Sequence, residues 1–129
     1  MGTIDGPGER QHFMAQYLIL IYASEGAWDA LTDEEREAAY AQYQAFDDRF
    51  GDAILGGSEL APTSTATSLR SDGAGGFVIT DGAFVETKEA LGGYFLVEAP
   101  TLDDAIAMAK HVPIFAGGLE VCPVSEQDG

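Results

Sequence analysis

Two short runs of apolar residues decide what this chain can fold into. Residues Tyr17–Tyr22 and Tyr94–Val97 are apolar at every position rather than at alternate ones. An alternating strand keeps one face in water, whereas a continuously apolar strand is typical of burial on both faces. The chain is therefore predicted to build a sheet that has to be covered on two sides.

An amphipathic segment after the first apolar run supplies one cover. Thr32 stands three residues before Glu35, which is the capping-box pattern that begins a helix. The helix is predicted to run to Phe50, with Gly51 closing it in a left-handed conformation. Its buried stripe is predicted to be Ala39, Tyr43, Phe46 and Phe50.

A shorter helix is predicted after the second apolar run. Thr101 is its expected N-cap, and Lys110 and His111 fall in its last turn, where positive charge suits the helix dipole. Pro113 prevents the helix from continuing. The buried stripe of this helix is predicted to be Leu102, Ala105, Ile106 and Ala109.

The remaining elements complete an α+β fold. Further strands are predicted over residues 54–60, 68–70, 77–80 and 119–124, with the second and third joined as a hairpin. Residues 87–91 are predicted to form one helical turn closed by Gly92. This order predicts a ferredoxin-like βαββαβ sandwich with an inserted hairpin and a charged loop. Because two helices cover only one face of the sheet, the other face is expected to pack on a second copy as a homodimer.

Length and charge limit the possible partners. The 129 residues suit one domain, expected over residues 14–126, with residues 1–13 as a disordered extension or a segment left from cloning. The formal charge of −16 argues against nucleic acid, since such binding relies on Lys and Arg. The apolar runs are too short to cross a membrane, and no secretory signal is recognised. With Cys122 as the single cysteine, we expect a reducing, cytoplasmic location and a small buried thiol.

The charged segment after the hairpin holds the candidate catalytic residues Asp81, Glu86 and Glu89. Carboxylates at the ends of strands around a barrel mouth can share a proton, and burial raises a carboxyl pKa toward the range useful in acid–base catalysis. A purely structural interpretation stays open, in which Asp81 caps the turn at Gly82 and Glu86 caps the turn at Thr87.

Four more residues are candidate ligand contacts: Tyr22, Trp28, Glu59 and Lys88. Tyr22 and Glu59 end predicted strands near the same mouth, and Lys88 lies in the charged segment. For Trp28, a place in the core or at an interface is the more common role of such an aromatic and stays open as the alternative. The sequence has no paired His-and-Cys spacing, so no metal site is predicted, and no cofactor is identified.

Several ordered blocks resemble one family. Residues 81–93 read Asp-Gly-Ala-Phe-Val-Glu-Thr-Lys-Glu-Ala-Leu-Gly-Gly, and residues 56–67 and 113–124 match further blocks of the YCII-related proteins, in the branch known by its DGPF motif. Ala83 replaces the usual Pro, and Cys122 replaces the usual Arg of the last strand. The resemblance implies a dimeric α+β barrel. A His–Asp pair used by some relatives does not carry over, because residues 22–28 contain no histidine.

Three functions are consistent with these observations. The first is binding of a small molecule, with acid–base catalysis on a small organic substrate as its enzymatic form. The second, implied by the resemblance, is a non-catalytic regulatory or binding module linked to sigma factors in transcription. The third is a structural dimer without a ligand. A pocket with convergent carboxylates favours the first function, a pocket without titratable groups the second, and a filled interior the third.

Overall fold

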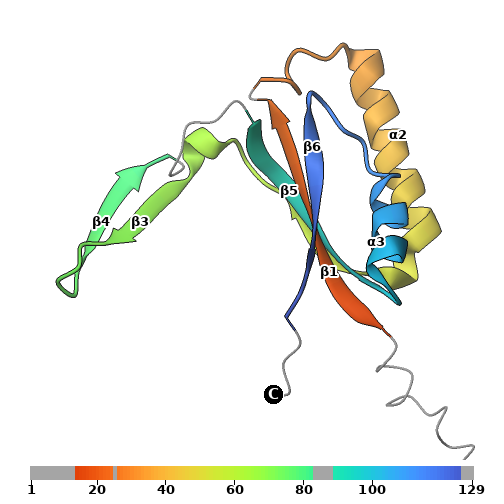
Figure 1. The fold of residues 1–129 in the computed structure, drawn as a ribbon. Helices are drawn as coiled ribbons and strands as arrows, with labels where there is room; N and C mark the ends of the chain where they lie inside the picture. Colours follow the sequence, from red (N-terminus) through yellow and green to blue (C-terminus); the bar gives the residue numbers. More distant parts are fainter. Residues whose placement is uncertain (1–13, 25, 83–88, 126–129) are drawn as a thin grey trace, which may run out of the picture.

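A four-stranded antiparallel sheet with both helices on one face forms the body of the molecule (Figure 1). The computed structural model describes residues 14–24, 26–82 and 89–125. The sheet has the order β2-β5-β1-β6, and β3 pairs with β4 in a separate two-stranded sheet. The elements are β1 Ala15–Ser24, α2 Asp33–Phe50, β2 Ile54–Glu59, β3 Thr67–Ser71, β4 Phe77–Asp81, β5 Glu89–Ala99, α3 Leu102–Ala109 and β6 Gly117–Pro123. This arrangement confirms the predicted ferredoxin-like α+β fold.

The capping box at the start of α2 is present as predicted. The Glu35 backbone N–H donates to Thr32 Oγ1 at 3.1 Å, and the Thr32 N–H donates to Glu35 Oε1 at 2.8 Å. The prediction for the end of this helix is wrong. Gly51 keeps helical angles (φ −48°) and begins a 3-10 turn that leads into β2, so no left-handed cap is needed.

The core lies between the sheet and the two helices. Tyr17 and Ile19 of β1 stand opposite Val97 and Phe95 of β5, which puts all four side chains on the helix side. Phe46 of α2 is 1% exposed and covers them, together with the core residues Ala105, Met108, Ala109 and Val112. Burying a side chain of this size contributes roughly 1.5–3 kcal/mol, so this layer holds the helices to the sheet.

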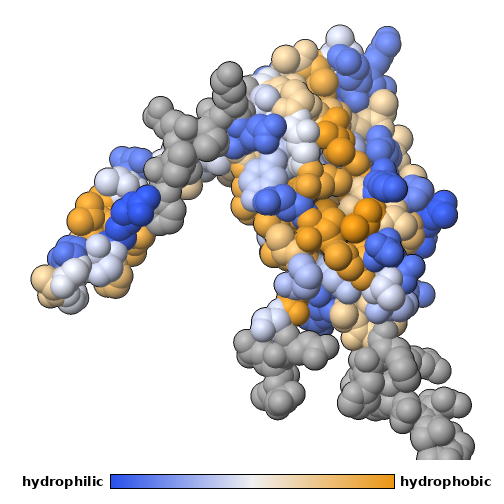
Figure 2. Space-filling view, viewed as in Figure 1, coloured by the Kyte–Doolittle hydropathy of each residue, from blue (hydrophilic) through white to orange (hydrophobic). Residues whose placement is uncertain are grey.

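The opposite face of the sheet has no helix over it (Figure 1). Since strand side chains alternate, Leu18 and Leu20 point away from the helices, with Leu96 and Tyr94 opposite them on β5. These four residues are half-buried in the single chain. Hydrophobic side chains gather over the strands in Figure 2. The two apolar strands therefore have one face covered by the helices and one face that no described part of the chain covers. The single cysteine, Cys122, lies opposite Leu18 and is half-buried, not fully buried as expected.

The β3–β4 hairpin projects from the body as an arm (Figure 1). Cross-strand pairing puts Leu69, Ile79 and Phe77 on one face of the arm, and these side chains are 49%, 64% and 67% exposed. Asp72 stabilises the hairpin turn, since its Oδ1 accepts from the N–H groups of Ala74 and Gly76 at 2.7 and 3.0 Å. The arm is therefore amphipathic, with an apolar face open to solvent.

The helical turn predicted over residues 87–91 is wrong for its described part. Glu89–Leu91 belong to β5 and pair with the last residues of β1, Tyr22–Ser24. The ladder absorbs Gly92 as a bulge, because Gly93 pairs with Ile21 while Leu91 pairs with Tyr22. Backbone pairing along the end of β1 outweighs the local helical tendency. Residues 87 and 88 lie outside the described residues.

Candidate functional site

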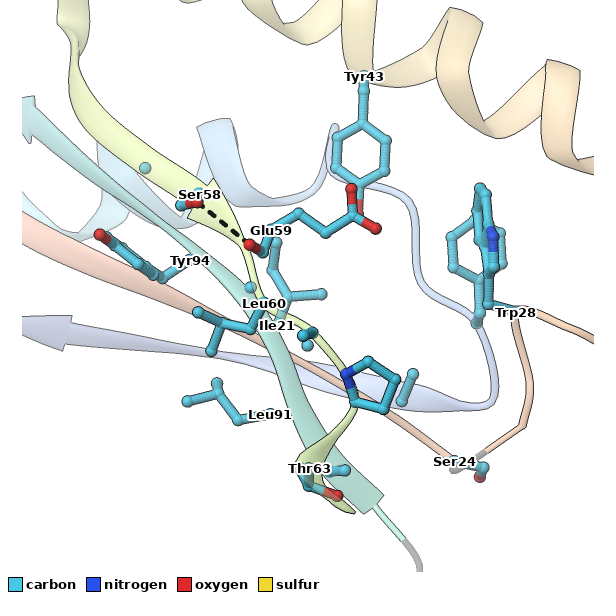
Figure 3. Close-up of a pocket in the computed structure, with 18 of the residues that line it drawn as sticks. Ile21, Ser24, Trp28, Tyr43, Ser58, Glu59, Leu60, Thr63, Leu91 and Tyr94 are labelled. Carbon is cyan, nitrogen blue, oxygen red and sulfur yellow. Dashed lines mark hydrogen bonds between the residues drawn. The ribbon is translucent and has the colours of Figure 1, made fainter. Parts of the chain in front are cut away.

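A cavity of about 570 Å³ opens where β2 ends and β5 begins (Figure 3). It lies between this end of the sheet, helix α2, and the segment that follows β1. Most of the lining is apolar, and the polar side chains come chiefly from Ser24, Ser58, Glu59 and Thr63. A concave, mainly apolar site with few polar groups is typical of small-molecule binding sites, which commonly measure about 300–1,000 Å³.

Trp28 forms the aromatic wall of the cavity. Its ring meets Tyr40 edge to face at 5.3 Å between centroids and Phe115 in the same manner at 5.8 Å. Such perpendicular contacts are a favoured geometry for aromatic pairs. The indole, in the segment after β1, therefore contacts both the following helix α2 and the connection before β6, which is distant in sequence.

Arg36 fixes the backbone around Trp28. Its Nε donates to the Trp28 carbonyl at 3.1 Å and its Nη2 to the Asp29 carbonyl at 2.8 Å. The same guanidinium contacts Asp33 Oδ1 at 3.2 Å. Because a planar guanidinium donates in fixed directions, these bonds tie the Trp28 segment to the first turn of α2. Arg36 is thus a positioning residue for the aromatic wall.

Glu59 supplies the charge in the cavity. Its pairing with Gly93 places the side chain on the helix side of the sheet, and Figure 3 shows the carboxylate pointing toward Tyr43. Burial, and secondly the Glu59 carboxylate, raise the pKa of the Tyr43 phenol. Among the described residues that line the cavity there is no Lys, Arg or His. The cavity therefore offers a carboxylate and a neutral phenol as its polar pair.

Glycines allow strands β2 and β5 to approach closely beside the cavity. A Cβ on Gly93 would come within 3.0 Å of the Ser58 carbonyl oxygen. Gly57 has φ +156°, and a Cβ there would meet the Tyr94 carbonyl oxygen at 2.6 Å, closer than real Cβ contacts. Strands β2 and β5 approach closely here only because both positions lack a side chain.

The structure brings together some of the residues singled out in the sequence and separates others. Trp28 and Glu59 both line the cavity. Asp81 lies exposed at the end of β4 on the arm, and Glu89 begins β5 opposite Ser24. Neither of these two carboxylates lines the cavity. Glu86 and Lys88 lie outside the described residues.

Tyr22 lies on the face of the sheet that has no helix. Its pKa is raised first by a hydrogen bond with Glu120 and then by burial. Tyr22 lies beside the Gly92 bulge of β5 and does not line the cavity. Sequence reasoning missed Tyr43, which it assigned to the core stripe of α2. The hydroxyl of Tyr43 could have indicated this position from the sequence. A Tyr in an apolar stripe usually lies at the edge of the core, because its hydroxyl group needs a polar partner or solvent.

Two kinds of site receive no support from the described residues. In the part of the chain that the structure describes, no three His, Cys, Asp or Glu side chains are grouped to hold a metal ion. Within the same residues, no helix has both the length and the apolar character needed to span a membrane.

Two comparisons place the chain among known proteins. The family model of the YCII-related domain matches residues 15–128. An uncharacterised protein of Rhizobium meliloti (strain 1021) is 34% identical over 98 residues, which cover 74% of this chain and 78% of that protein. The matched region contains every strand and helix described above.

Proposed function

The chain belongs to the YCII-related family, and from that premise we propose that it binds a small organic molecule in the cavity beside Trp28. The observation that carries the proposal is one arrangement: an aromatic wall at Trp28 opposite the polar pair Tyr43 and Glu59. The volume of about 570 Å³ suits a ligand of metabolite size. Tyr43, a protonated phenol at neutral pH, can donate a hydrogen bond, and Glu59 can accept one.

Binding is better supported than acid–base catalysis by the predicted acids. A general acid or base has to lie within hydrogen-bond reach of the reacting group. Asp81 and Glu89 do not line the cavity, which removes the geometric reason to assign them that role there. The open cavity also argues against a structural dimer with a filled interior. A regulatory module remains compatible, since a bound ligand is what such a module would sense.

We also propose that the protein acts as a homodimer. Leu18, Leu20, Tyr94 and Leu96 form a half-buried apolar surface with no helix over it, bordered by the exposed Glu120 opposite Leu20, and apolar patches with a polar rim mark interaction surfaces. The apolar face of the β3–β4 arm is a second such surface, and an isolated two-stranded hairpin is marginally stable by itself. A self-complementary twofold contact covers the sheet without requiring another protein.

A fragment titration followed by NMR tests the binding proposal. The chain has one tryptophan, so the indole N–H of Trp28 gives a single resonance inside the cavity wall. We expect some small aromatic or aliphatic fragments to shift this resonance together with the amide signals of Ser58 and Gly93. The amides of Thr80 and Ser68 on the arm are the internal control. A diverse library that leaves the Trp28 indole unmoved would refute the proposal.

A further inference from the structure

The geometry of the cavity points to a ligand class, and we propose that the site selects organic cations, meaning ammonium groups that carry apolar substituents. This inference rests on the proposed function and deepens it. Three observations support it: the charge of the lining, the placement of the basic residues that the structure describes, and the aromatic rings around Trp28.

The lining contains a negative group and no positive one among the described residues. Glu59 is its single charged side chain. An anionic ligand would lose its hydration and meet a carboxylate, whereas a cation would find an opposite charge. Aromatic and aliphatic groups supply the rest of the surface, which suits the apolar substituents of an ammonium ion.

The basic residues of the described chain lie elsewhere. Arg36 points into the backbone around Trp28 and contacts Asp33. Arg49 and Lys110 border a separate hollow between the C-terminal half of α2 and the end of α3, and Arg70 lies on the arm. None of them lines the cavity. The field of the whole molecule acts in the same direction, because 22 acids against 6 bases raise the local concentration of cations.

The rings supply the second half of a cation site. Trp28, Tyr40 and Phe115 all line the cavity, and the Trp28 ring stands at 71° to Tyr40 and at 78° to Phe115, so the three rings do not stack face to face. The face of an aromatic ring attracts a cation, and Trp is the strongest of the three aromatic side chains in this respect. Aromatic rings and a carboxylate that line the same cavity can bind an alkylammonium through both its charge and its methyl groups.

Three soluble probes of nearly the same shape test the inference. Choline carries a trimethylammonium group, 3,3-dimethylbutan-1-ol replaces its nitrogen by carbon, and 3,3-dimethylbutanoate carries a negative charge. Their dissociation constants are measured from the shift of the Trp28 indole resonance. We expect choline to bind at least about tenfold more tightly than the alcohol, and the carboxylate to bind least.

Two matched variants assign the preference to the cavity. Glu59→Gln should weaken choline binding about fivefold or more and weaken binding of the alcohol much less, because Gln keeps an acceptor oxygen but loses the charge. Glu34→Gln, the same substitution at an exposed site in the first turn of α2, should change neither value beyond a small loss from the altered net charge. The melting temperatures of both variants show that each remains folded.

The outcomes separate the two proposals. Equal or tighter binding of the alcohol or the carboxylate overturns the cation preference and leaves small-molecule binding in place. A choline response that Glu59→Gln and Glu34→Gln weaken equally overturns it as well, because the effect would then be general electrostatics. If choline does not shift Trp28 while other fragments do, only this inference fails. If no fragment shifts Trp28, both proposals fail.

Discussion

The carboxylate of Glu59, at the end of β2, points toward the phenol of Tyr43 on α2, and its negative charge helps to raise the pKa of that phenol. Burial is the larger cause of the raised pKa of Tyr43, and Glu59 is the second. The two residues belong to different layers of the fold. Their approach therefore depends on how α2 packs across the sheet, through Phe46 and Phe95, whose ring centroids are 4.8 Å apart.

The first prediction concerns the titration of Tyr43. Glu59→Gln should lower the pKa of Tyr43 but leave it above its ordinary value of 10.0, because burial persists. A group with a raised pKa in the folded state contributes stability that is present below about pH 10 and is lost as the pH rises through the folded pKa. Tyr43→Phe should reduce this alkaline loss. Ultraviolet titration and urea unfolding at alkaline pH measure both effects, and an unchanged Tyr43 pKa in Glu59→Gln would contradict the proximity.

The second prediction uses two adjacent glycines of β2. Gly57→Ala should destabilise the fold by about 2 kcal/mol or more, because its φ of +156° is unfavourable for Ala and the Cβ would meet the Tyr94 carbonyl. Gly56→Ala should stay within about 1 kcal/mol of the wild type, since nothing lies within 4 Å of its Cβ. Urea unfolding compares them. Equal effects would mean that the close approach of β2 and β5 is not required.

The third prediction concerns the uncovered face of the sheet. The wild type should be a dimer at micromolar concentration with an interface of at least roughly 1,200 Å². Leu18→Lys, whose cross-strand partners Cys122 and Leu96 carry no charge, should shift it toward monomers, because a charge would be buried in the contact. The control is Leu102→Lys on α3, which is 43% exposed on the helix side and should leave the dimer intact. Light scattering measures the mass, and a monomeric wild type would end the dimer proposal.

The fourth prediction concerns the start of α2. Hydrogen bonds from the Thr32 backbone and side chain lower the pKa of Glu35 below its ordinary value of 4.5. A lowered folded pKa gives stability that is present above about pH 4.5 and is lost as the pH falls through the folded pKa. Glu35→Gln should therefore reduce the stability at neutral pH and flatten its acid dependence. Glu34→Gln in the same turn should keep the slope.

Thr32→Ala extends the same test to the other half of the capping box. Loss of the N-cap oxygen should cost about 1 kcal/mol at neutral pH. Thermal unfolding at several pH values follows all three variants. An acid dependence that is the same in Glu35→Gln and Glu34→Gln would show that the capping box does not control it.

Local patterns were sufficient to predict most of the fold. The continuous apolar runs became the two central strands, β1 and β5, and the Thr32–Glu35 spacing became a capping box. These patterns depend only on residues that are neighbours in the sequence, so they can be recognised without knowing the tertiary structure. The start of β5 was missed because Glu89–Leu91 form strand through pairing with Tyr22–Ser24, which are distant in sequence. The helical angles of Gly51 were missed for a related reason, since the 3-10 turn depends on how β2 joins the sheet.

The candidate site was harder to predict than the fold. Glu59 was found because it ends a strand, and strand ends gather at one edge of a sheet. Asp81 also ends a strand, but β4 belongs to the projecting arm rather than to the main sheet. The sequence does not encode that separation locally, because it depends on which strands pair. Tyr43 was assigned to the core because its helical stripe is apolar. Its side chain does pack against the core, and it also lines the cavity.

Crystals of the protein soaked with the fragments that shift the Trp28 resonance give the most direct test of the proposed binding site. We predict electron density for the bound molecules in the cavity, with their apolar groups against Trp28 and their hydrogen-bond donor groups directed at Glu59. Density confined to the uncovered sheet face or to the arm, with the cavity holding only water, would contradict the account.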